Sequence, residues 1–235
     1  MKSTQQQARF AGFLYVLMIL IGLPGLLYVP EKLIGPGNAS ATATNIGASE
    51  WLVRAGIASD LIHQIIFVFL VLALYQLFKP VNESHARQMV LFVLVSVPIM
   101  FVNELNYIAA LILVSGANFL SVFDKAQLDA LAYLFLRLHG RGFNVTAIFW
   151  GLWLFPFGML VIRSRFIPRV FGVLLILAGV AYLANSFAIL VFPSYAPLVS
   201  KIASPLQAAE LPIVLWLLIW GAKTRENEFG QIVAK

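Results

Sequence analysis

The chain has 235 residues, of which 61% are hydrophobic and only 11% are charged, and its mean hydropathy is +0.90. Soluble globular domains average about 25% charged residues, so the expected solvent is the lipid bilayer, and a cytosolic enzyme, a secreted module and a disordered segment are excluded. The absence of cysteine excludes a disulfide framework and thiolate chemistry. The net charge of +6 arises from short basic clusters between apolar runs, which indicates membrane topology rather than nucleic-acid binding.

Six segments are long and apolar enough to cross a bilayer, because about 20 residues at 1.5 Å each span roughly 30 Å of hydrocarbon. We therefore predict an all-α, polytopic bundle of six transmembrane helices that forms one membrane domain over residues 1–235. The first apolar run is longer than the hydrophobic region of a cleaved signal peptide, so we expect it to be retained. The predicted spans are 10–29, 51–78, 88–115, 143–162, 170–192 and 206–222.

Lysine and arginine counts orient these spans, because connections on the cytoplasmic side carry an excess of both residues. Of the sixteen in the chain, ten lie on the side of both termini, so we expect the termini to be cytoplasmic and call the opposite side outer. The ten are Lys2, Arg9, Lys79, Arg87, Arg163, Arg165, Arg169, Lys223, Arg225 and Lys235. The remaining six are Lys32, Arg54, Lys125, Arg137, Arg141 and Lys201.

Two outer connections are predicted to carry structure of their own. In the first, a turn sequence at 35–38 precedes a small polar run, and Glu50 lies four residues before Arg54, in the order that favours a helical ion pair. In the second, apolar residues recur every 3.6 residues, which predicts a short interfacial helix that ends at Gly140 and Gly142. These periodic residues are Leu128, Leu131, Ala132, Phe135 and Leu138.

Polar side chains within the spans are the main indication of function. An ionisable group near the bilayer centre costs at least about 2.5–3.5 kcal/mol, so each needs an explanation. Counting about 1.5 Å per residue from the outer ends of the spans places these groups in the outer half of the membrane, with His63 and Glu104 near mid-depth. This asymmetry predicts a polar pocket that opens outward. Its candidates are Asp60, His63, Gln64, Asn103, Glu104, Asn106, Asn144, Thr146, Asn185 and Glu210.

Two other interpretations of these polar groups stay open. They could be interhelical hydrogen bonds that hold the bundle together. Some could bind zinc, iron or manganese, but no HxxxH, HExxH or ExxH spacing is present, so satisfied polar groups or a proton-linked carboxylate pair are favoured over a metal. The side chains weighed as metal ligands are Asp60, His63, Glu104, His139 and Glu210.

Three ordered segments resemble a bacterial membrane-protein family known only as domain of unknown function 4386. They are the stretch from Asn45 to Arg54 with Gly56 and Asp60, the stretch from Arg163 to Leu175 with Gly179 and Tyr182, and Glu210 followed by Leu215-Trp216-Leu217-Leu218 and Gly221. The resemblance covers nearly the whole chain and implies a six-helix protein of the bacterial inner membrane, but no activity, substrate or catalytic residue. One departure is Arg165, where the resemblance leads us to expect a small residue such as glycine.

We therefore expect a protein that binds a small amphipathic or lipidic ligand in the outer pocket, in a sensing or accessory role. The alternative is a membrane enzyme that uses carboxylate, histidine or metal chemistry on a lipophilic substrate. A proton-linked transporter is disfavoured because the inner half of the membrane lacks polar groups and no internal repeat is present. The expected partners are membrane lipids, not nucleic acid, and the cofactor is left unidentified. The expected ligand-binding residues are Asn45, Glu50, Arg54, Asp60, His63, Asn103, Glu104, Asn185 and Glu210.

Overall fold

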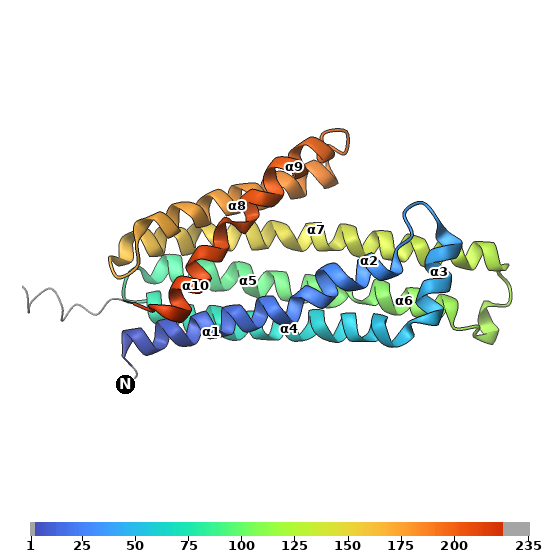
Figure 1. Cartoon of the computed structure of the whole chain (residues 1–235), viewed down its shortest axis with the longest axis horizontal. Coiled ribbons are helices and arrows are strands. Elements are labelled where there is room, and N and C mark those ends of the chain that lie inside the picture. The colour runs from blue at the N-terminus through green and yellow to red at the C-terminus, as the bar shows by residue number, and fades with distance from the viewer. Residues whose placement is uncertain (1–2, 223–235) are drawn as a thin grey trace, which may run out of the picture. The chain divides into compact units, whose positions relative to one another are not determined.

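The computed structural model describes residues 3–222, and this part of the chain is helical without a strand (Figure 1). Four of the basic residues that were counted for orientation, Lys2, Lys223, Arg225 and Lys235, lie outside the described residues. The longer helices are α1 (Thr4–Leu23), α4 (Glu50–Phe78), α5 (Glu83–Asn103), α7 (Lys125–Ser164), α8 (Arg169–Leu190) and α9 (Ala196–Gln207). The shorter ones are α2 (Val29–Leu33), α3 (Ala39–Ala48), α6 (Leu105–Val114) and α10 (Leu211–Ile219).

Six helical stretches among the described residues are long and apolar enough to cross a membrane, which confirms the predicted fold class. The largest difference from the predicted boundaries is in the fourth span, which begins at Lys125 rather than at residue 143. The last span begins at the start of α9 rather than near residue 206. The stretches are Thr4–Leu33, Glu50–Phe78, Glu83–Val114, Lys125–Ser164, Arg169–Leu190 and Ala196–Ile219.

Three of these spans are interrupted by irregular turns. A π-helical segment, η1 (Pro24–Tyr28), joins α1 to α2, and a 3-10 turn, η3 (Ala208–Glu210), joins α9 to α10. Glu104 alone separates α5 from α6. Pro24 and Pro212 account for two of these irregularities, because proline lacks the backbone N–H that a regular helix needs. Such interruptions occur frequently at functional sites.

The prediction of a separate interfacial helix before the fourth span is wrong. Residues Lys125–Ser164 form one continuous helix, α7, that passes through Gly140 and Gly142. A glycine inside a helix costs only about 1 kcal/mol relative to alanine, which neighbouring packing can offset. Gly142 illustrates this, since a Cβ atom there would collide with the side chain of Asn103. Because α7 does not break, His139 lies inside this helix, and its side chain is buried.

The described chain divides into two compact units. Among the described residues, unit 1 comprises 3–17, Ile66–Ser96 and 147–222, and unit 2 comprises Met18–Ile65 and Val97–Thr146. In unit 2, α3 packs against α6 and buries Ile46 in an apolar core (Figure 1). In unit 1, α9 returns along α8. The other buried side chains of the unit 2 core include Val29, Leu33, Val53, Tyr107, Leu111 and Leu136.

Candidate functional site

Unit 2 contains a cluster of three buried ionisable side chains, which we call the acidic cluster. It consists of Asp60 from α4, Glu104 from the junction between α5 and α6, and His139 from α7. Each side chain offers one oxygen or nitrogen atom that lies within 4.8 Å of the atoms offered by the other two. The exposed fractions of the three residues are 7%, 2% and 7% in the same order. Asp60 and Glu104, which the sequence analysis singled out by their cost in a membrane, therefore lie together.

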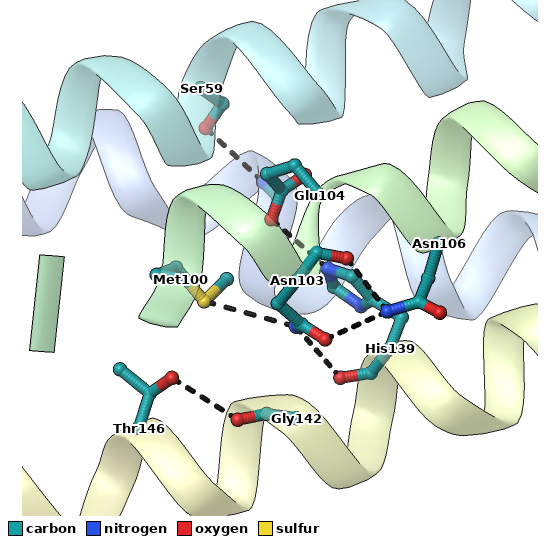
Figure 2. A network of polar contacts seen from close by, with 9 residues as sticks. Ser59, Met100, Asn103, Glu104, Asn106, His139, Gly142 and Thr146 are labelled. Carbon is teal, nitrogen blue, oxygen red and sulfur yellow. Dashed lines mark hydrogen bonds and ion pairs between the residues drawn. The ribbon is translucent and has the colours of Figure 1, made fainter. Parts of the chain in front are cut away.

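Glu104 uses only one of its two carboxylate oxygens in the described part of the chain. A hydrogen bond of 3.1 Å joins its Oε1 atom to Nε2 of His139 (Figure 2). Its Oε2 atom is fully buried and has no hydrogen-bond partner among the described residues. Buried polar atoms are nearly always paired, so an unpaired carboxylate oxygen marks a place where a bound group is missing or where the network serves a function.

Two asparagines and one tyrosine fix the position of His139. Asn103 donates a hydrogen bond of 2.9 Å to the backbone carbonyl of His139, and Asn106 donates one of 3.1 Å to the Asn103 side chain (Figure 2). The ring of Tyr107 lies against the imidazole, with 4.0 Å between the ring centroids. The histidine is therefore held by contacts to its backbone and its ring face, which leave its ring nitrogens available for the cluster.

Asp60 is accommodated by a close approach of the first span. A Cβ atom at Gly25 would overlap the Asp60 carboxylate, so only glycine fits there without a shift. Gly25 belongs to the π-helical segment η1, whose backbone is supported by the neighbouring Ser59. The Ser59 hydroxyl accepts a hydrogen bond of 3.3 Å from the Gly25 N–H and donates one to the Ile21 carbonyl. These two backbone groups would pair with each other in a regular α-helix, so Ser59 supports the interruption that makes room for Asp60.

Within residues 3–222, no lysine or arginine balances the charges of the acidic cluster. Neither Asp60 nor Glu104 forms an ion pair with a lysine or an arginine within the described residues. Two carboxylates close together in a medium of low dielectric repel each other, and a single imidazole can compensate at most one of them. The cluster must therefore take up protons or bind a group that supplies positive charge or hydrogen-bond donors.

The other predicted residues of unit 2 have partners of their own. Glu50 and Arg54 form the predicted ion pair at 2.6 Å, with side chains that are 57% and 66% exposed. Asn45 donates a hydrogen bond of 3.2 Å to the carbonyl of Leu33. His63 lies 2.9 Å from the Met18 carbonyl through its Nδ1 atom. These four residues share the unit with the acidic cluster, but these contacts are separate from it.

Two predicted residues belong to unit 1. Glu210 accepts hydrogen bonds from the hydroxyl groups of Tyr15, at 3.1 Å, and Tyr182, at 3.0 Å. Asn185 accepts one of 2.6 Å from Ser200. Glu210 thus has a donor for each carboxylate oxygen, in contrast to Glu104.

The predicted set of ligand-binding residues omits His139, although the sequence analysis weighed it as a metal ligand. The omission followed from the prediction that the fourth span begins at residue 143, which leaves His139 outside the span. The apolar residues that recur with helical period from Leu128 to Leu138 lead directly to His139. This pattern could have predicted that His139 lies inside the helix.

Comparison with known proteins identifies the chain only at the level of a family. A family described as Domain of unknown function (DUF4386) matches residues 10–221, nearly the whole chain. Neither the curated proteins nor the solved structures give a match. The matched stretch contains all three residues of the acidic cluster. The chain is therefore a member of the DUF4386 family, with six helices long and apolar enough to span a membrane.

Proposed function

We propose that this protein binds a small amphipathic or lipidic ligand whose polar end is held at the acidic cluster, in a sensing or accessory role. The observation that carries the proposal is the Oε2 atom of Glu104, which is buried and has no hydrogen-bond partner in the part of the chain that the structure describes, in a residue that is only 2% exposed. We further propose that the protein resides in the bacterial inner membrane with both termini in the cytoplasm.

The contrast with Glu210 favours binding over a purely structural role. A carboxylate that only joins helices is expected to have its oxygens satisfied by neighbouring donors, as the two tyrosines satisfy Glu210. Glu104 and Asp60 instead each offer an oxygen atom within 4.8 Å of the other acid and of one imidazole nitrogen. A buried carboxylate oxygen without a partner lowers the stability of the fold, and a purely structural role gives no reason to keep it. A bound group is therefore the simplest explanation.

The surroundings of the acidic cluster suit a ligand with an apolar body. Tyr107 lies against His139 and also belongs to the apolar core of unit 2, which contains Leu111 and Leu136. Ligand sites in proteins are mostly apolar with a few polar groups that fix the orientation of the ligand. An amphipathic molecule fits this combination better than a fully polar solute does.

A membrane enzyme is the second candidate, and the hydrogen bond between Glu104 and His139 favours it. A carboxylate that orients an imidazole at 3.1 Å is a common arrangement in general acid–base catalysis. Binding and catalysis would use the same residues. The two functions are distinguished by whether the bound molecule is recovered unchanged or converted to a product. The proposal of binding needs no bond to be broken.

The ligand can be sought by native mass spectrometry of protein extracted gently from its own membrane. We expect a co-purifying molecule at near one per chain in the wild-type protein. We expect Glu104→Gln to lose at least about tenfold of it, because an amide can neither carry the charge nor accept hydrogen bonds with both of its polar atoms. The matched control is Glu31→Gln, since Glu31 is an exposed residue of α2 in the same unit.

Equal amounts of bound molecule in Glu104→Gln and in the wild type would contradict the proposal. So would a wild-type protein that carries only the bulk lipids of the membrane in their ordinary proportions. Thermal unfolding of both variants in the same detergent checks that the Glu104→Gln protein is folded.

A further inference from the structure

We propose that the acidic cluster binds one divalent first-row transition-metal ion, with Asp60, Glu104 and His139 as its protein ligands. This inference rests on the proposed function, because it names the group that holds the polar end of the ligand at that site. Each of the three side chains offers one ligand atom, and these atoms lie within 4.8 Å of one another in a buried setting.

The spacing of the ligand atoms suits a metal ion. Zinc and similar ions bind nitrogen and carboxylate oxygen at about 2.0–2.2 Å, so two ligand atoms on one ion lie about 3.0–3.4 Å apart. The Glu104 Oε1 and His139 Nε2 atoms are already 3.1 Å apart. The third ligand atom comes from Asp60 and lies within 4.8 Å of both, so this carboxylate would move closer to them when the ion binds.

The unpaired oxygen of Glu104 supplies an independent indication of a ligand. Glu104 is 2% exposed, and its Oε2 atom has no partner among the described residues even though the other oxygen contacts His139. A cation bound between the two acids would satisfy this oxygen or displace the hydrogen bond to the imidazole in favour of coordination.

Charge and ligand type select the class of ion. Two carboxylates and one neutral imidazole carry a charge of −2, which a divalent cation cancels without help from lysine or arginine. Carboxylates suit manganese, whereas imidazole suits zinc and iron, and the cluster has no thiolate that would select soft metals. Manganese(II), iron(II) and zinc(II) therefore fit, and calcium and magnesium, which prefer oxygen ligands only, fit less well.

Residues around the cluster supply the support that metal ligands usually have. Asn103 anchors the backbone of His139, and Tyr107 packs on the imidazole. Gly25 leaves the space that the Asp60 carboxylate occupies, because a Cβ atom there would overlap it. Outer contacts of this kind orient metal ligands, and their loss typically weakens binding about 10–100-fold. Three protein ligands leave at least one coordination position for an oxygen atom of the amphipathic ligand.

The direct test is metal binding by the full-length protein in detergent. The protein is stripped with a chelator and titrated with cobalt(II), whose visible spectrum reports coordination by nitrogen and oxygen, and zinc, manganese and iron are then measured by mass spectrometry of the elements. We expect one ion per chain in the wild type. We expect Glu104→Gln, Asp60→Asn and His139→Gln each to bind at least about tenfold more weakly.

Matched controls use residues of the same type elsewhere in the chain. Glu31→Gln removes an exposed carboxylate from α2, and His85→Gln removes a histidine of α5 that belongs to unit 1. Both controls should keep one cobalt ion per chain. Gly25→Ala tests the support without changing a ligand, and we expect it to weaken cobalt binding while all three ligands remain.

The outcomes separate this inference from the proposed function. A wild-type protein that binds no metal, or cluster variants that bind it as tightly as the wild type, would overturn the metal site. If an organic molecule still co-purifies with such a metal-free protein and is lost in Glu104→Gln, ligand binding stands without a metal. If metal binds in the expected pattern but no organic molecule is recovered, the metal site stands and the ligand proposal fails.

Discussion

Arg165 holds a backbone conformation that suits glycine. It lies between α7 and α8 with φ at +61°, and it is the one non-glycine residue with positive φ among those described. This left-handed region costs an L-residue roughly 1–2 kcal/mol, and helices that end in it usually place glycine there. The family resemblance led separately to the expectation of a small residue. Arg165 therefore keeps a basic charge in this turn at the expense of conformational energy.

Replacing Arg165 with glycine should stabilise the protein. We expect Arg165→Gly to raise the free energy of unfolding by up to about 1 kcal/mol. Glycine relieves the backbone strain of the folded state, and this gain is larger than the stability lost because glycine makes the unfolded chain more flexible. Thermal unfolding in detergent measures the change. Arg165→Ala removes the charge but keeps the Cβ atom, so it should bring no gain. An equal rise in the free energy of unfolding in both variants would show that the charge of Arg165, not its backbone conformation, destabilises the protein.

Single residues differ in how far the sequence predicts their role. The cost of burying charge in a membrane identified Asp60 and Glu104 without a structure, because it depends on residue type and depth alone. The same argument selected Glu210, whose two tyrosine partners are far from it in sequence and could not be paired with it by pattern. Whether a buried carboxylate has hydrogen-bond donors for both oxygens depends on residues far away in the sequence. Glu104 and Glu210 differ in this respect, and the sequence alone does not show the difference.

The helices of unit 1 approach each other closely through glycines. A Cβ atom at Gly158 of α7 would lie 2.6 Å from the Gly172 carbonyl of α8, and one at Gly151 would lie 2.9 Å from the Gly179 carbonyl. The two glycines on each helix are seven residues apart, which places them on one face of that helix. Small residues allow backbones to pack closely where lipid gives no hydrophobic drive between helices.

Alanine at two positions of α7 should therefore have opposite effects. Gly158→Ala should lower the free energy of unfolding by about 1–3 kcal/mol, because its methyl group meets backbone that cannot move aside easily. Gly140→Ala should be neutral or stabilising by up to about 1 kcal/mol, since nothing lies within 4 Å of its Cβ position and alanine favours helix. Thermal unfolding in one detergent compares them. Destabilisation of both, to the same degree, would contradict the packing argument.

Interruptions of the helices were harder to predict than the helices. Pro24 and Pro212 signal irregular backbone, but they do not say that Ser59 of another helix would satisfy Gly25 and Ile21. The break at Glu104 has no proline or glycine beside it in sequence. Residue propensities can locate a helix interruption only when a nearby residue, such as proline, causes it. In this protein, contacts between residues far apart in the sequence also contribute to the interruptions.

For the whole molecule, the sequence analysis predicted the number of spans and their order because hydropathy is summed along the chain. The six stretches of the structure follow the predicted ones. The contact between His139 and Glu104 could not be predicted, because it depends on the rotation of each helix about its axis and on where each helix ends. The sequence led us to expect a helix end at Gly140 and Gly142, whereas the structure continues α7 through both and places His139 beside Glu104.

The orientation of the molecule in its membrane rests on charge alone. The excess of lysine and arginine on the side of the termini predicts that the connection between α4 and α5 is cytoplasmic and that the connection between α6 and α7 is outer. In this orientation, the proposed ligand of the acidic cluster would enter from the outer leaflet or the space beyond it. The reverse orientation would make the same cluster accessible from the cytoplasmic leaflet instead.

Labelling of single cysteines tests the orientation, and the absence of native cysteine makes the experiment clean. We expect Ser121→Cys, in the connection between α6 and α7, to react with a membrane-impermeant maleimide in intact spheroplasts. Ser84→Cys, in the first turn of α5, should react only after the membrane is opened. Both serines are exposed, so accessibility to the reagent depends on the membrane rather than on burial. Labelling of Ser84→Cys alone in sealed spheroplasts would reverse the topology and move the entry of the ligand to the cytoplasmic side.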